Sequence, residues 1–74
     1  MIAVEPARQA LVERKLRSVA SVTALYTVSG AWDLIAVVAA HSTEALDAAL
    51  DEVRDTPGVK ATVTSVVLSQ RFAR

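Results

Sequence analysis

The sequence predicts a small α+β domain in which a four-stranded antiparallel sheet carries two helices on one face, in the chain order β-α-β-β-α-β. Two segments place apolar residues at helical spacing, and four segments rich in Val, Thr and Ile have the lengths of strands. Each β-α-β unit crosses over right-handedly, so both helices fall on the same side of the sheet. This is the ferredoxin-like arrangement, and 74 residues suffice for one such domain, spanning 1–74.

The first half of the chain is expected to form a strand, a helix and a second strand. The first strand covers residues 1–5, and Pro6 follows at the first position of the helix, where its missing N–H is not needed. The helix extends to about Val19, and the second strand covers residues 22–29. The apolar stripe that faces the core consists of Leu11, Val12, Leu16 and Val19.

The third strand, expected over residues 32–41, indicates self-association. Every residue from Leu34 to Ala40 is apolar, whereas an antiparallel strand with one face in water alternates apolar and polar residues. Both faces of this strand are therefore expected to be covered, one by the helices and the other by a second copy of the chain. The hydrophobic content of 53% is high for a small monomer and agrees with this interpretation.

The second helix is expected to run from Ser42, a good capping residue, to about Asp55. Residues 56–58, Thr-Pro-Gly, end it, because proline cannot continue a helix and glycine accepts a left-handed turn. The fourth strand covers residues 59–68, and residues 69–74 form a short polar tail. The core positions of this helix are Leu46, Ala49, Leu50 and Val53.

The composition argues against several classes of function. There is no cysteine, hence no disulfide, and the single histidine cannot hold a metal by itself, so no cofactor is expected. Eight basic and eight acidic residues give zero net charge, which argues against direct binding of nucleic acid. The longest apolar run, residues 34–40, is far shorter than the roughly 20 residues of a membrane span. No secretion signal opens the sequence, and the expected location is the cytoplasm.

The candidates for catalysis are few, and we expect no enzyme. General acid–base chemistry needs a positioned partner in a pocket, and His41 stands beside a helix cap, where a structural role is favoured. The carboxylates of the second helix fall on its outward face. The alternative is a small enzyme on the same topology, such as a monooxygenase or an isomerase, for which Tyr26 and His41 are the candidate residues.

One group of residues, 29–33 (Ser-Gly-Ala-Trp-Asp), allows two interpretations. In the structural one, Gly30 forms the turn, Trp32 covers a strand end and Asp33 binds the turn backbone. In the functional one, glycine exposes backbone N–H groups to a ligand, and the carboxylate pairs with an ammonium group. Such donors beside an acid suit a zwitterion such as an amino acid, and the hydroxyls of Thr62 and Thr64 are placed to complete the site.

Two motifs resemble the effector-binding domain of the Lrp/AsnC family of transcriptional regulators, also called the RAM domain. Residues 28–34 (VSGAWDL) are similar to the family's hairpin of Thr or Ser, Gly, any residue, an aromatic and Asp. Residues 57–64 (PGVKATVT) resemble its Pro-Gly-Val followed by Thr-x-Thr, and Glu5-Pro6 matches its first strand-to-helix corner. The resemblance covers nearly the whole chain.

The resemblance implies properties that residue spacing does not reveal. Family members pack their sheets face to face as dimers of α+β barrel type, and the dimers often close into octameric rings of four dimers. Amino acids bind between dimers. The matching positions here put Gly30, Ala31, Trp32 and Asp33 on the hairpin side of the site, and Thr62 and Thr64 on the side of a neighbouring subunit.

The chain departs from the family pattern in three respects. It starts at the first strand without the helix-turn-helix domain that usually precedes it, this first strand is short, and Ala7 replaces a common glycine. A stand-alone domain of this kind is expected to sense an amino acid and to modulate transcription indirectly, or to co-assemble with full-length Lrp/AsnC regulators. A further alternative is an assembly module that binds no ligand.

Overall fold

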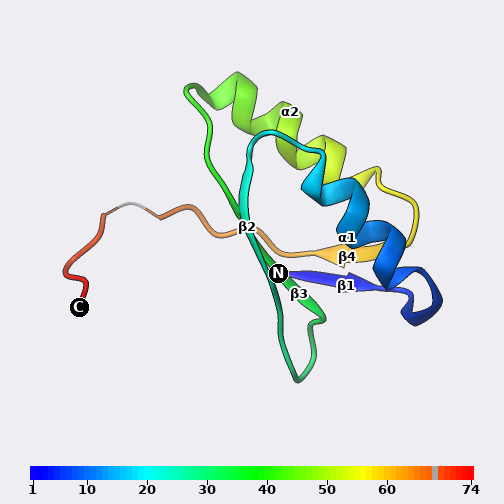
Figure 1. The fold of residues 1–74 in the computed structure, drawn as a ribbon. Coiled ribbons are helices and arrows are strands. Elements are labelled where there is room, and N and C mark those ends of the chain that lie inside the picture. The colour runs from blue at the N-terminus through cyan, green and yellow to red at the C-terminus, as the bar shows by residue number, and fades with distance from the viewer. Residues whose placement is uncertain (68) are drawn as a thin grey trace.

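The computed structural model, which describes residues 1–67 and 69–74, confirms the predicted ferredoxin-like fold. The sheet has the strand order β2-β3-β1-β4, and every pair of neighbours is antiparallel. Both helices cover the same face of the sheet (Figure 1). The elements are β1 (Ile2–Val4), a 3₁₀ turn η1 (Pro6–Arg8), α1 (Gln9–Arg17), β2 (Val22–Thr27), β3 (Leu34–Val38), α2 (Thr43–Arg54) and β4 (Val59–Thr62).

The core lies between the helices and the inner face of the sheet. Leu34 and Ile2 are partners across β3 and β1, and both are almost fully buried. The two side chains that α1 directs at them, Val12 and Leu16, have no exposed surface. Together these residues form one continuous apolar cluster, whose members are Ile2, Val4, Val12, Leu16, Leu34 and Val53.

The apolar stripes of the two helices are narrower than predicted. Leu11 was expected in the core but is 54% exposed, because it precedes Val12 and a step of one residue turns its side chain by about 100° around the helix. In α2, the buried positions are Ala49 and Val53. Leu46 and Leu50 are only half-buried, and both line an open cavity between α2 and the sheet.

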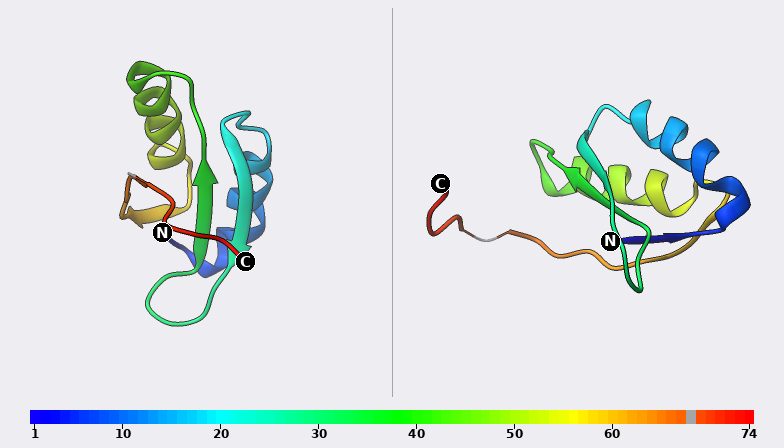
Figure 2. Two further views of the ribbon diagram at one scale, coloured as in Figure 1. Left: turned by 90° about the vertical axis from the view of Figure 1, so that its left-hand side faces the viewer. Right: turned by 60° about the horizontal axis from the view of Figure 1, so that its bottom comes forward.

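The strands are shorter than predicted, and β4 is shortened most. It was expected to reach residue 68, which lies outside the described residues, but it ends at Thr62. Its one neighbour is β1, and the pairing stops where the N–H of Val63 donates to the carbonyl of Met1 at 2.9 Å. Beyond this point the described residues belong to no strand, and the chain runs away from the body of the domain (Figure 2).

The start of α2 agrees with the prediction and provides a test of it. Ser42 is the N-cap, and its hydroxyl accepts a hydrogen bond from the N–H of Ala45 at 3.1 Å. Replacing Ser42 by Ala is expected to cost about 1 kcal/mol of stability, because that N–H loses its partner. Chemical denaturation measures the change. The neighbouring Thr43→Ala removes a hydroxyl without removing the cap, and an equal loss in both variants would contradict the assignment.

Candidate functional site

The predicted motif 29–33 forms an exposed loop between β2 and β3. Gly30 has a φ of +105° and no atom within 4 Å of the place that a Cβ would take, so its backbone is open to approach from outside. Ser29, Gly30 and Ala31 are exposed, whereas Trp32 is half-buried. The loop therefore offers backbone donors at its tip and an indole ring at its base.

Asp33 joins this loop to β1. Its N–H donates to the carbonyl of Ile2, and its Oδ2 accepts from the N–H of Val4, both at 3.0 Å. Its carbonyl accepts from the N–H of Val28, which closes the loop. In the structural interpretation the side chain would bind the turn backbone, but it binds the neighbouring strand β1 instead. The half-buried carboxylate is thus fixed in direction, and no donor among the described residues is bound to Oδ1.

The two threonines lie elsewhere in the same copy of the chain. Thr62 is the partner of Ile2, which is also the partner of Leu34, so β1 separates Thr62 from the loop. Neighbouring strands are about 4.8 Å apart, which puts Thr62 about 10 Å from the start of β3. Thr64 lies beyond the end of β4 and lines a cavity together with Leu46 and Leu50 of α2. A single copy does not bring the loop and these hydroxyls together.

The face of the sheet that the helices leave open is apolar. The views in Figure 2 show the helices on one side only. Four large side chains on the open face are roughly half exposed: Met1 (43%), Tyr26 (56%), Val37 (45%) and Val63 (44%). The cross-strand pairs Tyr26–Ile35 and Ala24–Val37 of β2 and β3 also lie on this face. Large apolar surfaces that remain open are commonly sites of interaction in other proteins.

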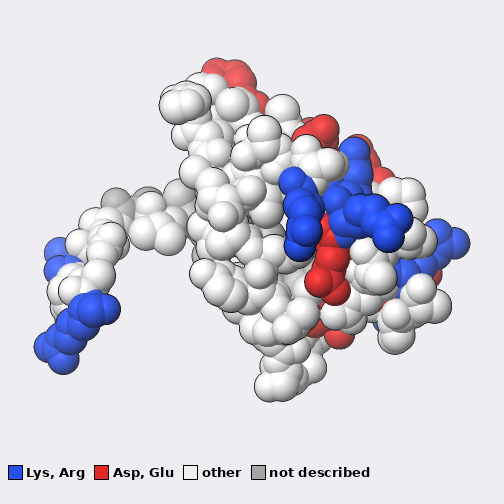
Figure 3. Space-filling view, in the orientation of Figure 1, with Lys and Arg blue, Asp and Glu red and all other residues white. Residues whose placement is uncertain are grey.

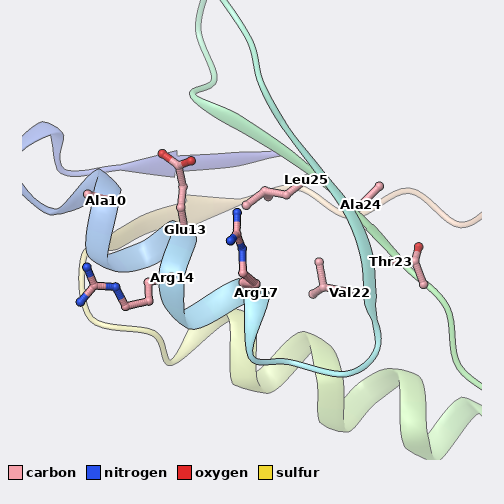
Figure 4. A pocket seen from close by; sticks show the side chains of 8 residues that line it. All are labelled: Ala10, Glu13, Arg14, Arg17, Val22, Thr23, Ala24 and Leu25. Carbon is pink, nitrogen blue, oxygen red and sulfur yellow. The ribbon is translucent and has the colours of Figure 1, made fainter.

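The groove between α1 and β2 is a separate feature. It has a volume of about 540 Å³, and its charged groups come from α1 (Figure 4). Arg17 extends towards β2, whereas Arg14 points away from it (Figure 4). Basic side chains gather over this helix (Figure 3). The groove contains no residue of the loop 29–33, so it belongs to a different surface.

The candidate catalytic residues lie far apart along the sheet. Tyr26 is the partner of Ile35 near the start of β3, whereas His41 lies beyond the end of that strand and is exposed. The described residues contain no group of three or more side chains that is suited to hold a metal ion. None of their helices is long and apolar enough to cross a membrane. The arrangement offers surfaces for binding and assembly.

A ferredoxin-like sheet with an open apolar face and a Gly-x-aromatic-Asp hairpin defines a small ligand-binding domain. The model of the Lrp/AsnC ligand binding domain family matches residues 1–74, the entire sequence, and the chain belongs to this family. Its role is accordingly regulatory effector binding, and the family is not a catalytic one. No curated protein matches the chain.

Proposed function

We propose that the chain binds an amino acid between its copies, at the loop 29–33, and passes this signal to the control of transcription. The observation that carries the proposal is the position of Asp33. Its carboxylate is held by the N–H of Val4 through one oxygen, which leaves the other free to pair with an ammonium group. A carboxylate whose orientation is fixed by a bond to β1 recognises a ligand at a low cost in entropy.

The rest of the loop supplies what an amino acid needs besides its ammonium group. The open backbone around Gly30 presents N–H groups to a carboxylate. Ala31 leaves room beside it, and the half-buried ring of Trp32 offers an apolar wall. Because the tip is exposed, a neighbouring copy must close the site, and Thr62 and Thr64 of that copy are the hydroxyls that we assign to it.

The open sheet face supports assembly of the copies. Two such faces pack together as a dimer through a two-fold axis, and four dimers close into an octameric ring in the same arrangement. Full-length Lrp/AsnC regulators are the partners through which a domain without net charge acts on transcription, since it does not neutralise phosphates itself. This action takes place in the cytoplasm.

Thermal unfolding in the presence of each common amino acid tests the proposal. A ligand that binds only the folded state adds about 2.7 kcal/mol of stability at ~100 times its Kd. For a domain of this size the expected rise in Tm is roughly 10–20 °C. One or a few amino acids should give this rise, and a flat panel would contradict amino-acid binding in favour of a ligand-free assembly module.

The substitution Asp33→Asn tests the site itself. Asparagine keeps an oxygen that accepts from Val4 N–H but removes the charge, so the fold is expected to persist while affinity falls by at least about tenfold. Isothermal titration with the amino acid selected from the panel measures this loss. Ser29→Ala, in the same loop, serves as the control, and an unchanged affinity in Asp33→Asn would remove Asp33 from the site.

A further inference from the structure

The charges of the two helices are segregated by sign. The segment that comprises η1 and α1, residues 6–17, contains four basic residues and one acidic residue, whereas α2 contains four acidic residues and one basic residue. A chain without net charge thus has a positive and a negative half, and the basic side chains gather over α1 (Figure 3). A local field of this kind attracts groups of the opposite sign, although the net charge is zero.

The groove between α1 and β2 lies in the positive half. Its charged wall contains Arg14 and Arg17, and Glu13 is the one acidic residue among those that line it (Figure 4). The ion pairs of the described residues lie elsewhere, at the start of η1 and at the end of α2. Both guanidinium groups of the groove are therefore available to a carboxylate from outside the chain.

The floor of the groove is apolar. It contains Val22 and Leu25 of β2, which are half-buried and pack against the core of the domain. Ala10 of α1 also lines the groove, and its small side chain leaves space above the floor. Because the floor is fixed by the core, a partner that binds there orders few side chains of this domain. The groove thus offers an apolar base and a cationic rim.

We propose that a short acidic segment of another protein docks in this groove, with an apolar side chain on the floor and a carboxylate on Arg17. This arginine extends towards β2 (Figure 4), and Arg14 adds to the positive field from the outer side of the helix. Arginine binds a carboxylate through two parallel N–H···O bonds. In an extended segment successive side chains point to opposite sides, so alternating apolar and acidic residues fit the base and the rim.

The shape and the surroundings of the groove favour a protein segment over other anions. Small-molecule sites enclose roughly 70–90% of their ligand, whereas none of the residues that line this groove is itself buried. The helix α1, residues 9–17, spans only about 14 Å. A nucleic acid extends beyond this length, and the exposed carboxylates of α2, which lies in the same layer (Figure 1), repel its phosphates.

A fluorescently labelled peptide of alternating leucine and aspartate, about six residues long, is the probe for this groove, and fluorescence anisotropy measures its affinity. We expect Arg17→Gln to weaken binding at least about tenfold. Lys60→Gln removes the same charge from an exposed side chain of β4 and should leave the affinity unchanged. Equal losses in the two variants would mean that the attraction has no defined site, and they would overturn the proposal.

Three further measurements distinguish an acidic segment from other occupants. The same peptide with asparagine in place of aspartate should bind at least about tenfold more weakly, and an equal affinity would contradict a role of the arginines. A short DNA duplex should not displace the acidic peptide, and displacement would assign the groove to a phosphate chain instead. Sedimentation velocity should give the native protein and the Arg17→Gln variant the same mass. A lower mass of the variant would mean that α2 of a second copy occupies the groove, and it would overturn the proposal.

Discussion

Gly58→Ala is expected to destabilise the domain by about 3 kcal/mol. Gly58 has a φ of +101°, and a Cβ built on it would lie 2.8 Å from Cβ of Arg8 and 2.9 Å from Cγ2 of Val12. Val12 is fully buried and Arg8 Cβ is fixed to the backbone of η1, so neither atom moves without displacing its element. Chemical denaturation at a fixed protein concentration measures the loss.

Gly30→Ala is the matched control for this substitution. The φ of Gly30 is +105°, nearly the same as that of Gly58, but its surroundings are empty. The two variants therefore share the cost of placing alanine in a left-handed conformation, about 1 kcal/mol, and differ in the steric clash alone. If both variants lose the same stability, the close packing of Gly58 against the first helix contributes nothing measurable.

The packing around Gly58 shows which part of the fold the sequence predicts and which it does not. Residues 56–58 predict the end of α2 through their local chemistry, and the structure confirms it. The approach of Arg8 and Val12 to Gly58 joins residues about 50 positions apart, and no local pattern contains it. In the same way, residues 59–68 have the composition of a strand along their length, but the length of β4 is set by the extent of β1, its neighbour.

For the candidate site, too, local residues located the loop, whereas its long-range contact was not predicted. The loop 29–33 was located by its glycine, aromatic and acidic residues, and the structure places them in one loop that is exposed at Gly30 and half-buried at Trp32 and Asp33. The bond from the N–H of Val4 to Asp33 spans 29 positions and was not predicted. It makes the structural and the functional interpretations of Asp33 compatible, because one oxygen binds β1 and the proposed function needs only the other.

Tyr26→Asp is expected to dissociate the dimer that we propose to form through the open sheet face. Tyr26 is 56% exposed there, between apolar neighbours on both strands of the β2–β3 pair. A carboxylate at this position would lose its hydration when two apolar faces pack. We expect the dimer to weaken about 100-fold, which corresponds to about 2.7 kcal/mol. Sedimentation velocity over a range of concentrations measures the change.

Leu11→Asp is the control for this substitution, because it adds the same charge at a different place on the surface. Leu11 is 54% exposed, almost the same as Tyr26, but it lies on α1, on the opposite side of the sheet. It should leave the dimer intact, and far-UV circular dichroism should show folded protein for both variants. A dimer equally stable in both would place the interface elsewhere.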